Sequence, residues 1–205
     1  LILHGNGGHR GHRLDWLREL RSLGCGLFIV DYRGYGGSSG SPTEEGFYRD
    51  AEAARAWLAA RAKGKVVYFG ESIGCGVAVE LARRHPPAAL ILQSGFSCAV
   101  DVARRAYPYF PVKLLMKDRF ESARKIVDVK CPILCIHGDA DSIVPMSLGR
   151  ALFEAAPEPK EWLEVPGADH NDLPWIDLKA YKARIEAFIR KHARASGSGE
   201  GRGQR

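Results

Sequence analysis

One serine lies in a short glycine-flanked segment that is typical of a covalent nucleophile. The segment Gly70-Glu71-Ser72-Ile73-Gly74 follows an apolar run at 65–69 that predicts a buried strand, and it precedes a run at 75–84 that predicts a helix. A G-x-S-x-G sequence between a strand and a helix is the context of a nucleophile elbow, a sharp turn that lifts the serine hydroxyl above the sheet. Glycines at both ends leave room for such a turn. Ser72 is therefore the candidate nucleophile.

Candidates for a base and an acid occur further along the chain, in the order that a triad of this kind requires. A serine nucleophile needs a base that accepts its proton and an acid that orients the base. The expected chain order is serine, acid, histidine. Asp139 and Asp141 directly follow one predicted strand, and His170 follows the next. Because the carboxyl ends of parallel strands meet at one edge of a sheet, these side chains are expected to lie near Ser72.

The acids and histidines differ in their suitability. Asp141 is the favoured acid, because Asp139 is better placed beside the strand end to cap the turn through backbone N–H groups. Asp169 immediately precedes His170 and is expected to point away from it. His170 is the only histidine in a loop downstream of both Ser72 and the acid-bearing loop. Other interpretations are favoured for the remaining six, and His137 in particular is expected to make structural hydrogen bonds. The six are His4, His9, His12, His85, His137 and His192.

A glycine-rich loop after the first predicted strand could bind the negative charge that develops in acyl transfer. In the run His4-Gly5-Asn6-Gly7-Gly8 the backbone can approach a ligand closely. Backbone N–H groups of this loop, together with that of Ile73, could form an oxyanion hole. The alternatives are a simple turn or a phosphate loop. Nucleotide binding is disfavoured because neither the P-loop pattern nor a dinucleotide fingerprint with its ribose-binding acid is present.

The loop 31–40 is the second glycine-rich segment of the N-terminal half. Its composition predicts a long turn after a strand. Two of its aromatic residues, Tyr32 and Tyr35, could either line a pocket or cover the core, and the sequence does not favour one role over the other.

Apolar runs alternate with amphipathic segments along the chain. Strands are predicted at 1–3, 26–32, 65–69, 88–93, 131–137 and 162–165. Helices are predicted at 13–23, from an N-cap at Thr43 to about 62, and at 75–84, 146–156 and 173–192. This alternation predicts an α/β fold with a mostly parallel sheet and helices on both faces.

The alternation is interrupted at 96–129, a segment that contains several aromatic residues and prolines. Because it follows a strand whose carboxyl end borders the candidate site, a short cap over the site is favoured over a surface helix with its linker. Residues 1–192 are expected to form one domain that includes this cap. Residues 193–205 contain mostly Gly, Ser and Arg and are expected to be disordered.

Composition argues against several classes of protein. The chain has 205 residues, of which 45% are hydrophobic and 26% charged, as in ordinary globular domains. Its formal net charge is +6, but no basic stripe interleaved with aromatic residues is evident, so nucleic-acid binding is disfavoured. The five scattered cysteines favour reduced thiols and a reducing compartment. No ligand spacing for a metal is present, and no metal or cofactor is predicted.

The start of the chain shapes the expected cellular location. The sequence contains no run of about twenty apolar residues, so no membrane-spanning helix is predicted. The sequence opens at Leu1-Ile2-Leu3, without a methionine and already inside a predicted buried strand. Leading strands of the sheet are therefore expected to be missing, and a signal peptide or membrane anchor could precede them. The predicted location is cytoplasmic, or membrane-associated through such a segment.

The ordered motifs resemble the α/β-hydrolase superfamily. HGNGG, DYRGYGGSSG, GESIG, HGDADSIVP and GADHND follow one another across 1–191. Within the superfamily the chain is similar to the branch of α/β-hydrolase domain-containing protein 13 with its bacterial relatives, and to the small depalmitoylases of the domain-containing protein 17 type. That branch usually continues its first motif as HGNAGN, whereas Gly7, Gly8 and His9 follow Asn6 here. The resemblance implies catalytic Ser72, Asp141 and His170, with backbone oxyanion donors at Asn6 and Ile73.

The resulting hypothesis is a serine hydrolase that cleaves small-molecule carboxylic esters or thioesters through an acyl-enzyme. The short cap predicts an open site that accepts small or flexible acyl groups. A peptidase or an acyltransferase with the same triad is one alternative. A non-catalytic interaction module that retains the fold is another.

Overall fold

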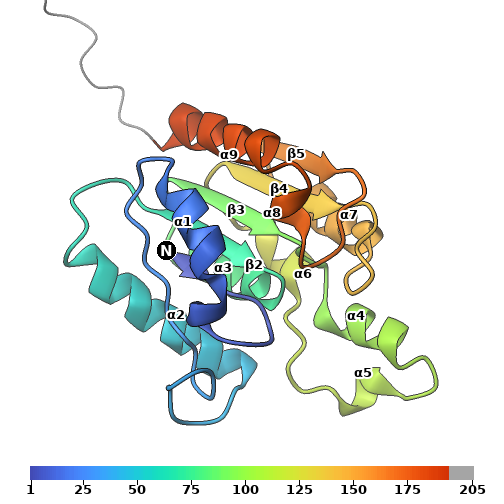
Figure 1. Cartoon of the computed structure of the whole chain (residues 1–205). Helices are drawn as coiled ribbons and strands as arrows, with labels where there is room; N and C mark the ends of the chain where they lie inside the picture. The colour runs from blue at the N-terminus through green and yellow to red at the C-terminus, as the bar shows by residue number, and fades with distance from the viewer. Residues whose placement is uncertain (194–205) are drawn as a thin grey trace, which may run out of the picture.

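Five parallel strands form one sheet in the order β1-β2-β3-β4-β5 (Figure 1). The computed structural model describes residues 1–193, so the predicted tail beyond Ala193 lies outside the described residues. The strands are β1 (Ile2–Leu3), β2 (Val67–Glu71), β3 (Ala89–Gln93), β4 (Ile133–Gly138) and β5 (Lys160–Val165). Because all pairings are parallel, the loops that follow the strands emerge at one edge of the sheet.

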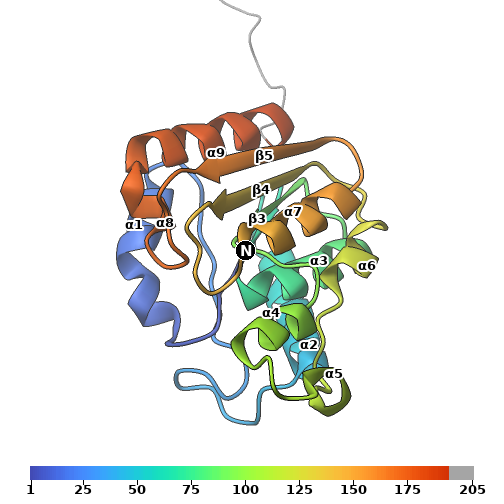
Figure 2. The same ribbon diagram turned by 90° about the vertical axis from the view of Figure 1, so that its right-hand side faces the viewer.

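Helices cover both faces of the sheet (Figures 1 and 2). Their bounds are α1 (Leu14–Arg21), α2 (Glu44–Ala59), α3 (Ile73–Arg84), α4 (Ala99–Ala106), α5 (Val112–Leu115), α6 (Ser122–Ile126), α7 (Met146–Ala155), α8 (Leu173–Ile176) and α9 (Leu178–His192). A 3₁₀ turn at Arg10–Arg13 precedes α1. The side chains of α1 and α9 pack on one face, while those of α2, α3, α6 and α7 pack on the other.

The strands are apolar on both faces because each face is covered. In β3, Leu90 and Leu92 join the core beneath α3, while Ile91 between them joins the core beneath α9. Successive side chains of a strand point to opposite faces of the sheet. Because both faces are covered by helices, the central strands contain continuous apolar runs. The predicted α/β fold with a parallel sheet is confirmed.

Two predicted elements differ from the structure. Residues 26–32 do not form a strand. A single parallel bridge pairs Ile29 with Ile2, and the Ile2 N–H donates to the Phe28 carbonyl at 2.8 Å. Because β1 has only two residues, it is too short to pair with 26–32 through more than this single bridge. The predicted helix 173–192 is divided at Asp177, whose non-helical backbone ends α8 and whose carboxylate caps α9.

The start of α2 agrees with the sequence. The Thr43 hydroxyl accepts a hydrogen bond from the Gly46 N–H at 3.1 Å, so Thr43 is the N-cap that its residue type predicts. Acidic Glu44 and Glu45 follow in the first turn, where the helix dipole favours negative charge. The helix ends at Ala59, and residues 60 and 61 continue as a turn.

The segment 96–129 contains three short helices. Of these, α6 packs against α3, while α4 and α5 lie together at the periphery of the molecule (Figures 1 and 2). Within residues 1–193, no helix combines the length and apolar character needed to cross a bilayer.

We predict that Gly74→Ala destabilises the fold, because a Cβ at this position would collide with the Leu3 carbonyl and lie 2.7 Å from the His4 carbonyl oxygen. Backbone atoms cannot rotate away as a flexible side chain can. The free energy of unfolding, measured by urea denaturation, should fall by roughly 3 kcal/mol. Gly64→Ala is the matched control, since a Cβ added there would have open space within 4 Å. Equal stability of the two variants would contradict the prediction.

Candidate functional site

Ser72 lies in a strained turn between β2 and α3. Its φ is 53° and its ψ is −119°, a left-handed conformation that is uncommon for residues other than glycine. The turn needs small neighbours. A Cβ on Gly70 would lie 2.7 Å from the Cα of Cys75, and Gly74 packs directly against β1. The glycine spacing that identified the segment is therefore a steric requirement of the turn.

Ser72, His170 and Asp141 form a continuous hydrogen-bonded chain. The Ser72 Oγ lies 3.0 Å from His170 Nε2, and His170 Nδ1 lies 2.8 Å from Asp141 Oδ2. An ionised carboxylate can only accept, so Nδ1 carries the proton and Nε2 is left to accept the serine hydroxyl. The three side chains come from the loops after β2, β5 and β4, as the sequence predicted from their chain order.

Asp141 is buried and remains ionised because of its partners. Its Oδ1 accepts from the backbone N–H groups of Ile143 at 3.0 Å and Val144 at 2.7 Å. Burial alone would raise the pKa of the carboxyl group, but hydrogen bonding with His137 and His170 holds that pKa well below its usual range. His137 Nε2 also donates to the Val144 carbonyl at 2.9 Å, which is the structural role expected for it.

The two neighbouring aspartates make other contacts. Asp139 Oδ1 accepts from the Gly167 N–H at 2.6 Å, so it ties the loop after β4 to the loop after β5. Asp169 Oδ1 accepts from the backbone N–H groups of Ser142 and His170, both at 2.7 Å. Asp139 thus binds the backbone of the neighbouring loop instead of capping its own turn as expected. Asp169 contacts the His170 backbone, while Asp141 contacts its ring.

The loop after β1 passes beside the elbow. A Cβ on Gly5 would lie 3.1 Å from the Ser72 Cβ, and Asn6 lines the same cavity as Ser72. Ile73 is the first residue of α3, where helix N–H groups have no partner within the helix. The structure therefore brings both predicted oxyanion donors to the vicinity of Ser72.

The two tyrosines of the loop 31–40 take different positions. Tyr32 is fully buried, and its ring stacks on Phe47 in the core. Tyr35 is half-buried, and its hydroxyl donates to Asn6 Oδ1 at 2.5 Å. Tyr32 therefore covers the core, whereas Tyr35 restrains the side chain of Asn6 at the edge of the cavity.

An ion pair that was not predicted joins the loop after β1 to the elbow. Arg13 Nε donates to Glu71 Oε2 at 2.8 Å, and Glu71 is the residue directly before Ser72. The same carboxylate oxygen accepts from the Gly5 N–H at 3.2 Å. Arg13 also donates to the carbonyls of Gly5 and Gly7 at 3.4 and 3.3 Å. Glu71 lies within the G-x-S-x-G segment, so the sequence did point to this member of the ion pair. No local pattern identified the other member, Arg13.

A cavity of about 710 Å³ lies beside the elbow, and Arg13, Glu71, Ser72 and His170 are among the residues that line it. Polar groups of the loop after β1 and of the start of α1 line one side of it, while Ile143, Pro174 and Trp175 contribute apolar surface. None of the residues that line it belongs to 96–129. The site is therefore bordered mainly by loops of the sheet edge, with His170 and Ser72 at the cavity wall.

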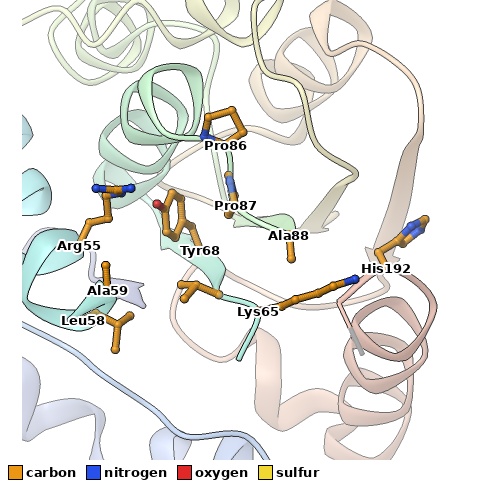
Figure 3. A pocket seen from close by; sticks show the side chains of 10 residues that line it. Arg55, Leu58, Ala59, Lys65, Tyr68, Pro86, Pro87, Ala88 and His192 are labelled. Atoms are coloured by element: carbon orange, nitrogen blue, oxygen red, sulfur yellow. The ribbon is translucent and has the colours of Figure 1, made fainter. Parts of the chain in front are cut away.

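A second cleft, of about 480 Å³, lies at the other edge of the sheet (Figure 3). Its lining includes Lys65 and Ala88, which precede β2 and β3, and His192 at the end of α9. Because Ser72 follows the carboxyl end of β2, the length of the strand separates this cleft from the elbow. Ser72 and His170, in contrast, line the first cavity.

The chain belongs to the α/β-hydrolase family. A family model described as alpha/beta hydrolase fold matches residues 1–120, which include the loop after β1, the elbow and the start of 96–129. The predicted resemblance to the superfamily is thus confirmed.

Relatives with similar sequences support the same membership. An uncharacterised protein of Mycobacterium tuberculosis is 40% identical over 196 residues, which cover 94% of this chain and 70% of the relative. Alpha/beta hydrolase domain-containing protein 17B of Homo sapiens is 39% identical over 197 residues, covering 92% of this chain and 65% of that protein. This chain therefore spans about two thirds of the length of these relatives.

Solved structures share the fold at lower sequence identity. The Pyrococcus furiosus esterase Pf2001 superposes with a TM-score of 0.78 and 20% identity, covering 93% of this chain and 81% of that one. A Paleococcus ferrophilus monoacylglycerol lipase has a TM-score of 0.70 and 21% identity, covering 92% and 93%. At this level of identity the likeness establishes the fold.

We predict that Arg13→Ala lowers stability, because it removes the guanidinium that donates to the Glu71 carboxylate and to the carbonyls of Gly5 and Gly7. The expected loss in the free energy of unfolding is roughly 1–3 kcal/mol. Arg18→Ala is the control, because its ion pair with Asp15 is exposed on α1 and should contribute little. A loss in the control equal to that in Arg13→Ala would argue against a specific role for Arg13.

Proposed function

We propose that the protein is a serine hydrolase that cleaves carboxylic esters or thioesters. The observation that carries the proposal is the chain of hydrogen bonds from Ser72 through His170 to Asp141, set in the strained turn before α3. A base and an orienting acid within hydrogen-bond reach of a serine are the parts that nucleophilic catalysis needs.

In the proposed first step, His170 Nε2 accepts the Ser72 hydroxyl proton as Oγ attacks the acyl carbonyl. The tetrahedral intermediate then collapses, the bond to the leaving group breaks, and His170 donates its proton to the departing alcohol or thiol. Water attacks the acyl-enzyme in the second step. His170 takes a proton from that water and returns it to Ser72 as the acid product leaves. Asp141 stabilises the positively charged imidazole in both steps, since its low pKa keeps the carboxylate ionised.

Backbone donors are proposed to stabilise the oxyanion of each intermediate. The N–H of Ile73 is at the positive end of α3, where the helix dipole favours negative charge. The N–H of Asn6 belongs to the loop that passes beside Ser72, and Arg13 and Glu71 hold that loop in place. Losing one such donor typically costs on the order of 3 kcal/mol of transition-state stabilisation.

Esters and thioesters are proposed over peptides because two solved structures with this fold are an esterase and a monoacylglycerol lipase. Both substrate classes present a reactive carbonyl and a leaving group that needs only one proton. Apolar surface at Ile143, Pro174 and Trp175 suits an acyl chain, and the polar side of the cavity suits the leaving group. A peptidase or acyltransferase would use the same triad and would be recognised by its products.

We predict that Ser72→Ala abolishes hydrolysis of p-nitrophenyl acetate and butyrate, because the nucleophilic oxygen is lost. The kcat should fall by about 10⁴-fold or more. A fluorophosphonate probe should label the wild-type protein on the peptide that contains Ser72 and should not label this variant. Ser97→Ala, in the loop after β3, is the matched control and should retain both properties. Full activity of Ser72→Ala would refute the proposed function.

The identity of the acid is tested by two matched variants. Asp141→Asn removes the charge that holds His170 in the correct tautomer, so kcat should fall by about 10³- to 10⁴-fold. Asp139→Asn keeps an oxygen that can accept from the Gly167 N–H and does not touch His170, so it should change kcat little. Steady-state kinetics on p-nitrophenyl butyrate compares the two. A larger loss in Asp139→Asn would reverse the assignment.

A further inference from the structure

The segment 104–117, here called the α4–α5 tip, displays an unusual amount of apolar surface. Eleven large hydrophobic side chains are exposed among the described residues, and five of them lie in this tip. Tyr109 is 96% exposed and Leu114 is 84% exposed. The other three are Tyr107, Phe110 and Leu115. Contiguous exposed apolar surface of this kind marks an interaction site on a folded protein.

The tip is also positively charged. Four exposed cations lie within it, namely Arg104, Arg105, Lys113 and Lys117. Their side chains have no hydrogen bond or ion pair with any residue of 1–193, and no acidic residue occurs between Asp101 and Asp118. The sequence alone did not suggest basic residues grouped with aromatic ones. These residues are neighbours along the chain, and the structure adds that their side chains are exposed.

The base of the tip is fixed to the body of the protein. The Glu44 carboxylate accepts from the backbone N–H groups of Arg119 at 2.7 Å and Phe120 at 2.9 Å. On the other side of the tip, the Ala99 N–H donates to the Arg119 carbonyl at 2.8 Å. Phe120 itself is buried in the core. The apolar side chains are thus presented on an anchored support at the periphery, where Figures 1 and 2 place α4 and α5.

We propose that the α4–α5 tip docks on the surface of an anionic lipid bilayer. Tyrosine and phenylalanine rings prefer the headgroup region of a membrane, and leucine side chains insert below it. Lysine and arginine at the same depth are attracted to anionic headgroups. The tip combines these three features within one short segment, which fits a peripheral contact.

The charge of the tip argues against a contact between two copies of the chain through this surface. A symmetric contact between two copies would bring the same patch of each together. Four unpaired cations would then face four others, and such like-charge contacts are unfavourable. A nucleic acid would satisfy the charges but would give Leu114 and Leu115 no apolar surroundings. An anionic bilayer satisfies both the charges and the apolar side chains.

The tip and the proposed nucleophile emerge at the same edge of the sheet. The segment that leads into α4 follows β3, whose last residue, Gln93, accepts a hydrogen bond at its carbonyl from the Ser72 N–H at 2.9 Å. Docking does not depend on the proposed hydrolysis. If both hold, the site would be held close to esters at a membrane surface.

Sedimentation with lipid vesicles tests the docking. The wild-type chain should sediment with phosphatidylcholine vesicles that contain phosphatidylglycerol, and much less with phosphatidylcholine alone. Binding should weaken as salt is added, since the attraction to headgroups is screened. Ser72→Ala should bind as the wild-type chain does, which separates failure of docking from failure of the proposed chemistry.

Matched variants locate the contact. Arg104→Gln with Lys113→Gln should weaken binding by about fivefold for each cation removed. Lys63→Gln with Lys65→Gln makes the same change in net charge at the opposite edge of the sheet, where both lysines are exposed, and should leave binding nearly intact.

The apolar part of the contact is tested in the same way. Leu114→Ser should weaken binding by about tenfold. Val127→Ser, at an exposed valine beside α6, should not.

Hydrogen–deuterium exchange on the wild-type chain provides a test that needs no variant. Anionic vesicles should slow exchange within 104–117. Absence of sedimentation with anionic vesicles, protection confined to another region, or equal losses in the tip and control variants would overturn the proposal. A dimer in the absence of lipid that Leu114→Ser dissociates, seen by analytical ultracentrifugation, would also overturn it.

Discussion

The candidate site depends on one close approach, between β1 and the first turn of α3. Gly74 has no side chain, so the helix start can lie against the backbone of Leu3 and His4. The chain must then reverse sharply, and Ser72 takes a positive φ to do so. Its N–H is bound to the Gln93 carbonyl of β3, which helps to hold the strained residue in place. The position of the hydroxyl is thus a consequence of backbone packing.

The parallel topology brings the remaining groups to the same edge. The loops that contain Asp141 and His170 follow the adjacent strands β4 and β5, so the two side chains lie close enough to form a hydrogen bond. Asp139 links these two loops through Gly167. On the other side of Ser72, Arg13 and Glu71 bind the loop after β1. A site held from several directions requires little reorganisation as charge develops, which is the condition for electrostatic stabilisation.

Much of the fold and the triad could be predicted because they depend on local patterns and on a known order of elements. Continuous apolar runs identify strands that are covered on both faces, and the loops after them must share an edge. The segment 26–32 was wrongly predicted as a strand, since propensity does not reveal that its partner β1 has only two residues. Arg13 was not predicted because its partner is 58 residues away along the chain. Such contacts have no signature in either local sequence.

By itself, the sequence determined the fold class and pointed to the residues that we propose carry the chemistry. Glycine spacing, chain order and apolar periodicity restrict the backbone, and they identify Ser72, Asp141 and His170 without coordinates. The tertiary structure alone decided which side chains support these residues and which surfaces are displayed. It gave Tyr35 a contact with Asn6, and it left the cations and aromatic rings of the α4–α5 tip exposed. The reason is physical: turns and strands are set by neighbouring residues, whereas ion pairs between distant segments and the exposure of a given side chain are decided only when the chain folds.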